Sequence, residues 1–145
     1  MESMIGGGGP VAVDTSIFIY FIEEHPEFLR LVHPLFQAAD AGVATLVTSA
    51  VTLLELLVMP YRKGDALLAA KYEQLLTRSR GVRLIDLDRS QLRAAAYLRA
   101  LHGLRTVDAI QIAAALASGC STFLTNDLRV PTIPGLKVVQ LSDSI

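Results

Sequence analysis

Four carboxylates stand within or beside stretches of apolar sequence, where an unpaired charge is costly. They are Asp14, Glu55, Asp108 and Asp127. An ionised carboxylate in apolar surroundings strongly destabilises a fold unless a partner neutralises it. Few basic residues stand beside these positions in the sequence, and one divalent cation could neutralise several carboxylates at once. The sequence therefore predicts a metal site with carboxylate ligands.

The places of these acids in the expected elements favour their convergence. Asp14 and Asp127 each follow an expected strand, and functional groups gather at the carboxyl ends of parallel strands. Asp108 falls on the first turn of an expected helix, where the helix dipole favours an anion. Glu55 projects from the first half or middle of another helix. Mutual repulsion would oppose this crowding, and Mg²⁺ or Mn²⁺, which prefer oxygen ligands, would relieve it.

The chemistry that such a site suggests is hydrolysis of a phosphodiester, with the metal polarising the phosphoryl oxygen and activating water. Arg105 could neutralise a phosphate. Short polar side chains beside the acids could position a phosphate or the attacking water. They are Thr15, Ser16, Thr125 and Asn126. A plainer interpretation stays open, because an Asp after a strand often caps a helix or forms a turn.

The composition is that of one folded domain. The chain has 145 residues, of which 52% are hydrophobic and 19% charged, and this argues against disorder. We expect a single domain over residues 10–145 after a flexible glycine-rich leader, residues 1–9, which lacks the blocks of a signal peptide. No stretch has the character of a membrane span. The lone Cys120 permits no intrachain disulfide and favours the cytoplasm.

The net charge of −1 gives no general basic signature for nucleic acid. The distribution is nevertheless uneven, because the bases are concentrated after Tyr61 and most of them are Arg, which suits phosphate. An ordinary solvated surface explains this pattern equally well.

Strands alternate with helices along the chain. Strands are expected at 10–13, 43–47, 82–87, 122–126 and 138–141, and helices at about 15–23, 26–41, 49–60, 64–78, 89–102 and 106–119. Thr15 or Ser16, Ser49 and Thr106 are the expected helix caps, and the third helix should stop near Pro60. This alternation is typical of a three-layer α/β/α sandwich with a mostly parallel central sheet.

Four segments carry a family resemblance by their order and spacing. They are Val11-Ala-Val-Asp-Thr-Ser16, Leu54-Glu-Leu56, Thr106-Val-Asp-Ala-Ile-Gln-Ile-Ala114 and Leu124-Thr-Asn-Asp127. Together they resemble a PIN-domain ribonuclease over about residues 11–141. In length and order the chain is similar to VapC, the toxin component of prokaryotic VapBC toxin–antitoxin pairs.

The resemblance implies a PIN-like fold and an endoribonuclease that depends on Mg²⁺ or Mn²⁺. Asp14 and Asp108 would be the principal metal ligands, and Glu55 and Asp127 would complete the site, partly through water. The resemblance also implies an RNA substrate, a homodimer and a small antitoxin protein as partner.

Three points remain open at this level. Either Thr15 or Ser16 could match a hydroxyl position of the family, and Thr125 matches another. The chain could instead be a catalytically inactive PIN-like module that binds RNA or protein. It could also be a small phosphohydrolase that acts on nucleotides.

Overall fold

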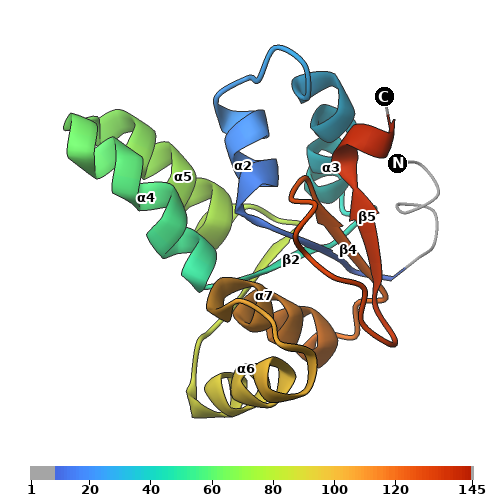
Figure 1. Cartoon of the computed structure of the whole chain (residues 1–145). Helices are drawn as coiled ribbons and strands as arrows, with labels where there is room; N and C mark the ends of the chain where they lie inside the picture. Colours follow the sequence, from blue (N-terminus) through green and yellow to red (C-terminus); the bar gives the residue numbers. More distant parts are fainter. Residues whose placement is uncertain (1–8, 145) are drawn as a thin grey trace.

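A five-stranded sheet forms the centre of the molecule (Figure 1). The computed structural model describes residues 9–144. The strands are β1 (Val11–Val13), β2 (Leu46–Ser49), β3 (Val82–Ile85), β4 (Thr122–Thr125) and β5 (Lys137–Gln140). Their order across the sheet is β3-β2-β1-β4-β5, and every neighbouring pair is parallel. The prediction of a mostly parallel sheet is confirmed.

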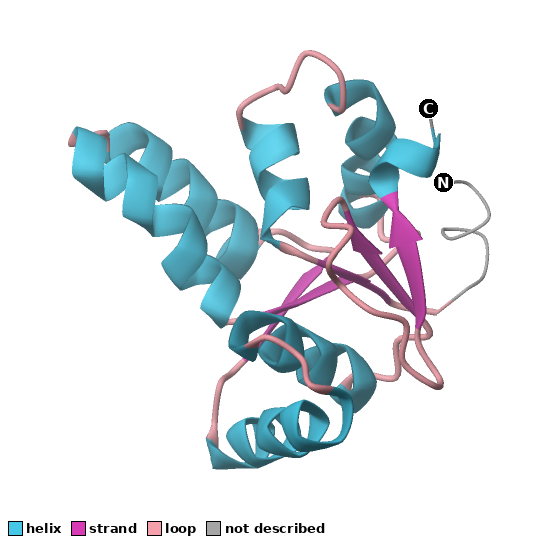
Figure 2. Ribbon diagram, in the orientation of Figure 1, coloured by secondary structure: helices cyan, strands magenta, loops and turns pink. Residues whose placement is uncertain are grey.

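Helices cover both faces of this sheet (Figure 2). The helices are α2 (Thr15–Ile22), α3 (Leu29–Asp40), α4 (Val51–Lys63), α5 (Ala66–Arg78), α6 (Arg89–His102) and α7 (Thr106–Ala117), with a final 3₁₀ turn, Leu141–Ser144. In Figure 1, α2 to α5 lie on one side of the sheet, whereas α6 and α7 lie on the other. The predicted three-layer sandwich is therefore confirmed.

The layers follow from the period of the strands, because successive side chains of a strand point to opposite faces. In β1, Val11 and Val13 join the core under α2 and α3, which is built around Phe18 and Leu35. Ala12 joins the opposite core under α6 and α7. Burial on both faces explains why β1 is continuously apolar rather than alternating.

The order of the strands reverses between β1 and β4. From β1 the chain moves outward through β2 to β3, then crosses the other face by α6 and α7 and returns to β4 on the far side of β1. In open α/β sheets a crevice forms at this point, outside the carboxyl ends of the strands. Residues that follow β1 and β4 are thus brought side by side.

None of the three predicted helix caps is the N-cap in the structure. Asp14, rather than Thr15 or Ser16, is the N-cap of α2, and its carboxylate accepts a hydrogen bond from the Ser16 backbone N–H at 3.1 Å. Arg105 stands at the N-cap of α7 without a side-chain capping bond, which makes Thr106 the first helical residue. A carboxylate accepts a capping hydrogen bond as readily as a hydroxyl, so residue type alone did not decide between neighbours.

Helix α4 also differs from its prediction. It begins after Ala50, although the Ser49 hydroxyl still accepts the N–H of Val51 at 3.2 Å. It continues through Pro60 and ends at Gly64, whose φ of 65° is the left-handed conformation that glycine adopts without strain. Burial of Pro60 in the packed helix pair outweighed its local tendency to end a helix.

The remaining differences are shifts of element ends. Helix α3 begins at Leu29 rather than near residue 26, because the His25 ring accepts the N–H groups of Glu27 and Phe28 and so organises a turn. The second strand occupies 46–49 instead of 43–47, since the N–H of Val43 bonds back to the end of α3. The other predicted strands match within two residues at each end.

Most of the predicted leader lies outside the described residues, which include only Gly9 of residues 1–9. Over the described range, no helix has both the length and the apolar character needed to cross a bilayer.

Candidate functional site

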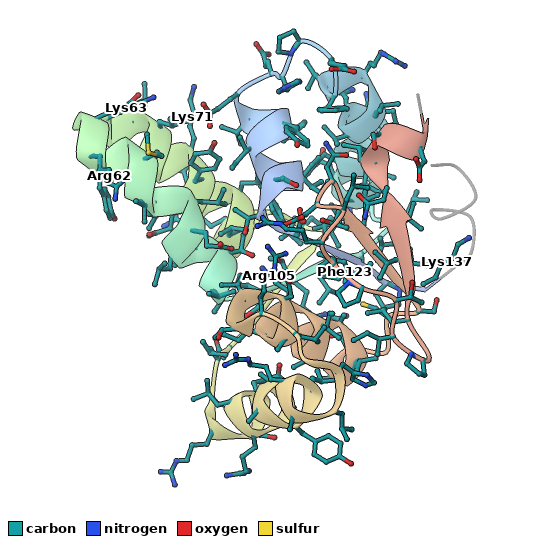
Figure 3. The ribbon with its side chains drawn as sticks, in the orientation of Figure 1. Arg62, Lys63, Lys71, Arg105, Phe123 and Lys137 are labelled. Atoms are coloured by element: carbon teal, nitrogen blue, oxygen red, sulfur yellow. The ribbon has the colours of Figure 1, made fainter. Side chains whose placement is uncertain are left out.

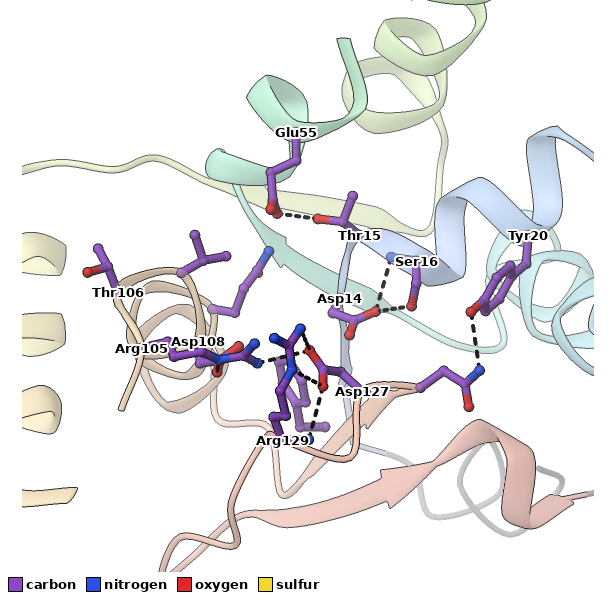
Figure 4. Close-up of a pocket in the computed structure, with 14 residues that line it drawn as sticks. Asp14, Thr15, Ser16, Tyr20, Glu55, Arg105, Thr106, Asp108, Asp127 and Arg129 are labelled. Atoms are coloured by element: carbon purple, nitrogen blue, oxygen red, sulfur yellow. Dashed lines mark hydrogen bonds and ion pairs between the residues drawn. The ribbon is translucent and has the colours of Figure 1, made fainter. Parts of the chain in front are cut away.

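A pocket of about 480 Å³ opens at the carboxyl edge of the sheet, where the order of the strands reverses. All four predicted acids line it, as do Thr15, Ser16, Arg105 and Asn126 (Figure 4). Thr125 is fully buried beside the pocket rather than in its lining. The structure therefore brings together the residues that the sequence singled out from distant segments.

Asp14 is held at the end of β1 by neutral donors. Its carboxylate accepts the Ser16 hydroxyl at 2.5 Å, the Ser16 N–H, and the hydroxyl of Thr125. Burial raises the pKa of Asp14 above its ordinary value, and the nearby charge of Asp127 adds to this, although the hydrogen bonds from Ser16 and Thr125 act in the opposite direction. Among the described residues no basic side chain forms an ion pair with Asp14. Its negative charge is thus only partly compensated.

Thr125 connects the two central strands at their ends. Its hydroxyl donates to Asp14 and accepts the backbone N–H of Asp127 at 3.0 Å. One side chain therefore sets the position of two of the acids.

Glu55 reaches the pocket from α4. Its Oε1 accepts the Thr15 hydroxyl at 2.5 Å (Figure 4). Thr15 and Ser16 thus both belong to the site, and they serve different carboxylates, Glu55 and Asp14 respectively. The sequence had left the choice between these two hydroxyls open.

Two arginines accompany the other acids. Arg105 donates through Nε to Asp108 at 2.6 Å and through Nη2 to Asp127 at 2.9 Å. Arg129 holds Asp127 through Nε and Nη2, each at 3.0 Å. The hydrogen bonds from Arg129, with a further contribution from Arg105, keep the pKa of Asp127 well below its usual range. The two arginines therefore favour the charged form of Asp127, whereas burial opposes the charged form of Asp14.

Asn126 has a mainly structural set of contacts. Its amide nitrogen donates to the Tyr20 hydroxyl at 3.2 Å, and its carbonyl oxygen accepts the N–H of Ser142 at 3.2 Å. These bonds tie the loop after β4 to α2 and to the final 3₁₀ turn.

The arrangement does not form a closed cage for a metal. Within residues 9–144, no three His, Cys, Asp or Glu side chains lie close enough together to hold one ion. Arg105 supplies the positive charge between Asp108 and Asp127. Mg²⁺, however, usually takes only one or two carboxylates and completes its shell with water. An all-oxygen donor set in which Asp14 and Glu55 have only neutral partners fits such an ion.

Six of the lining residues were not predicted as site residues, and Arg129 and Gln111 are two of them. Arg129 follows Asp127 by two residues, a spacing at which a turn can return a side chain to its neighbour. Gln111 interrupts the apolar run of α7, one turn after Asp108, and this lone amide was the signal that could have identified it.

Comparison with known proteins gives one family. The family model of the PIN domain matches residues 11–136. No curated protein sequence matches the chain.

Several solved structures share the fold. VapBC2 from Rickettsia felis, bound to a DNA fragment from its promoter, is 23% identical with a TM-score of 0.66, and the match covers 90% of this chain and 97% of that chain. A toxin–antitoxin complex from Klebsiella pneumoniae is 19% identical with a TM-score of 0.66 over the same fractions. VapC20 from Mycobacterium tuberculosis, a toxin that cleaves the sarcin–ricin loop, is 18% identical with a TM-score of 0.67 over 83% of this chain and 92% of that chain.

Proposed function

This chain belongs to the PIN domain family, and we propose that it is a metal-dependent endoribonuclease, the toxin of a toxin–antitoxin pair. The single observation that carries the proposal is the grouping of four carboxylates around one pocket, with Asp14 partly buried and unpaired with any base among the described residues. Residues 10–145 would form the nuclease domain.

We propose that Asp14, Glu55, Asp108 and Asp127 hold Mg²⁺ or Mn²⁺, directly or through water. A bound ion would polarise the scissile phosphate and lower the pKa of a water molecule that attacks it. The protein's own contribution is to fix the ligands in place before the ion arrives. The hydroxyl of Thr125 does this for Asp14 at the junction of β1 and β4.

The two arginines of the pocket are suited to RNA phosphate. The Arg105 side chain is 41% exposed and that of Arg129 is 74% exposed, so a phosphate can reach both guanidinium groups. Arginine binds phosphate through paired N–H donors, as it now binds Asp127. We propose that a bound cation takes the place of Arg105 beside Asp108 and Asp127, and that the Arg105 side chain then turns to the phosphate of the incoming RNA.

A second group of bases lies outside the pocket. Arg62, Lys63 and Lys71 lie toward the free end of the α4–α5 hairpin, whereas Arg105 lies at the centre of the molecule (Figure 3). All three are exposed. They could contact the backbone of an RNA that extends beyond the pocket, and this contribution would weaken with added salt.

The proposed partners follow from the fold relatives. The structures from Rickettsia felis and Klebsiella pneumoniae contain a toxin together with an antitoxin. We propose that this chain forms a homodimer in the cytoplasm and is silenced by a small antitoxin encoded beside it. Co-expression with the neighbouring reading frame, followed by purification and light scattering, tests both parts.

Cleavage of a labelled single-stranded RNA in Mn²⁺, in Mg²⁺ and in EDTA tests the activity. We expect cleavage with either metal, none in EDTA, and none from Asp14→Asn or Asp108→Asn protein. Asp88→Asn is the matched control, because Asp88 is likewise an N-cap whose carboxylate accepts a backbone N–H, yet it lies outside the pocket. If Asp14→Asn and Asp108→Asn both cleave like the wild type, the proposed site is wrong. Cleavage of mononucleotides in preference to RNA would identify a small phosphohydrolase instead.

One observation favours the inactive RNA- or protein-binding module as a second candidate. Arg105 already neutralises Asp108 and Asp127, which reduces the local need for a cation. Under this alternative the wild-type protein would bind RNA in EDTA and would not cleave it in any metal.

A further inference from the structure

A buried cluster of polar side chains lies beside the acidic pocket. It consists of Thr48, Ser49, Thr52 and Gln111, and each of these residues is at most 3% exposed. Gln111 also contributes to the lining of the pocket. Buried polar groups require partners, so a cluster in the core has to be connected internally.

Gln111 is the centre of this cluster. Its Nε2 donates to the Thr52 hydroxyl at 2.7 Å, and its Oε1 accepts the backbone N–H of Ser49 at 3.1 Å. The hydroxyls of Thr48 and Thr52 are 2.6 Å apart, and that of Thr48 also donates to Oε1 of Gln111 at 3.3 Å. A single amide thus joins α7 to the end of β2 and to the first turn of α4.

These attachments are one helical turn away from two of the acids. Asp108 precedes Gln111 by three residues on α7, and Glu55 follows Thr52 by three residues on α4. Side chains three residues apart lie on the same face of a helix. The amide therefore joins the two helices one turn away from the position at which each presents its carboxylate to the pocket.

Packing alone does not explain a glutamine at this position. Ile110 and Ile112 are adjacent to it in α7, and Ala113 to Ala115 are all buried, so Gln111 is the one polar side chain in a buried apolar run. An apolar residue could not accept the Ser49 N–H or orient Thr52. The amide is the group that supplies a directional connection between α4 and α7.

We propose that Gln111 is a positioning residue that fixes the spacing of Asp108 and Glu55, and thereby sets the affinity of the pocket for a divalent cation. This inference rests on the proposed metal-dependent function. Groups that hold metal ligands in place typically change metal affinity by roughly 10–100-fold. Because Gln111 acts through two helices rather than on a carboxylate directly, we expect an effect near the lower end.

The test is titration of Mn²⁺ into the metal-free protein by isothermal titration calorimetry, without RNA. Gln111→Met keeps the length of the side chain and removes the amide, and we expect its dissociation constant for Mn²⁺ to rise about tenfold. Thr52→Val should weaken binding similarly, whereas Thr52→Ser, which keeps the hydroxyl, should retain the wild-type affinity. Because the Thr52 pair probes the same bond, it decides the question if Gln111→Met does not fold.

Tyr72→Phe separates positioning from general destabilisation. Tyr72 is 1% exposed and donates to Glu23, outside the pocket lining. Loss of the Tyr72 hydroxyl, and with it the hydrogen bond to Glu23, should lower the unfolding temperature and leave the Mn²⁺ affinity unchanged.

Two results overturn the inference in distinguishable ways. If the wild type binds Mn²⁺ and Gln111→Met and Thr52→Val bind it equally well, Gln111 has no positioning role and the proposed function stands. If the wild type binds no Mn²⁺, the proposed metal dependence fails, and the role of Gln111 fails with it.

Discussion

Asp14→Asn should make the metal-free protein more stable while abolishing its activity. Burial opposes the charge of Asp14, and the residue accepts hydrogen bonds from Ser16 and Thr125 that an Asn oxygen can also accept in part. Asn and Asp are about equally good N-caps, so the exchange leaves the start of α2 intact. The main change is removal of a charge that has no basic partner among the described residues.

We expect a gain of about 0.5–2 kcal/mol in the free energy of unfolding at neutral pH, the usual range for a single stabilising substitution. For a domain of this size, each kcal/mol corresponds to a rise of about 2–4 °C in Tm. Asp88→Asn isolates the effect of the cap, because Asp88 is an exposed N-cap, and it should leave Tm nearly unchanged.

The pH dependence has a defined sign. The pKa of Asp14 is raised above the ordinary value of 3.8, so the native state holds the proton more tightly than the unfolded state. Any stability that the group contributes is complete below pH 3.8 and is lost as pH rises through its native pKa. The stability advantage of Asp14→Asn should therefore be near zero in acid, grow as pH rises above 3.8, and then level off.

Thermal unfolding with EDTA and with Mn²⁺ completes the assay. A ligand that binds only the native state stabilises it by about 2.7 kcal/mol at 100 times its dissociation constant. The order of stability should thus reverse, with Asp14→Asn above the wild type in EDTA and below it in saturating Mn²⁺. If Asp14→Asn is less stable than the wild type in EDTA at neutral pH, the charge of Asp14 does not destabilise the metal-free protein and the reasoning is wrong.

Three further predictions concern other parts of the chain. Arg105→Gln removes the charge that bridges two pocket carboxylates, so calorimetry should show several-fold tighter Mn²⁺ binding. A gel shift assay in EDTA should show weaker RNA binding by the same variant. Unchanged metal affinity would mean that Arg105 does not compete with the ion. Gly81→Ala would place a Cβ 2.3 Å from the Ala39 carbonyl oxygen, and urea unfolding should show a loss of roughly 1–3 kcal/mol, which a wild-type midpoint would contradict. Cys120 is buried, and burial raises the pKa of its thiol to about 11, so a thiol reagent at pH 8 should label it slowly until the protein is unfolded; rapid labelling of the native protein would refute that burial.

The sequence was sufficient for the layered fold and for the four carboxylates of the pocket. Short apolar strands that alternate with helices leave few arrangements other than a parallel sheet covered on both faces. The carboxyl ends of such strands lie on one edge, so Asp14 and Asp127 could be expected to meet. This prediction depends on the order of the strands and helices and not on the exact residue at which each begins or ends.

Details that depend on competition between neighbouring groups could not be predicted. Asp14, Thr15 and Ser16 can all cap a helix. Only the packed structure shows that Asp14 is the cap and that the Thr15 hydroxyl donates to Glu55 instead. Pro60 ends helices locally, but tertiary packing keeps it inside α4. The pairing of Arg105 with Asp127, 22 residues away, depends on a loop geometry that no spacing rule specifies.

The hydrogen bond between Thr125 and Asp14 joins positions 111 residues apart in the chain. During synthesis on a ribosome, the amino-terminal wall of the pocket emerges long before its carboxyl-terminal counterpart. A polypeptide released before residue 125 lacks the last residue of β4, and with it the hydroxyl that orients Asp14. Translation products that end before Thr125 would then be unable to assemble the pocket.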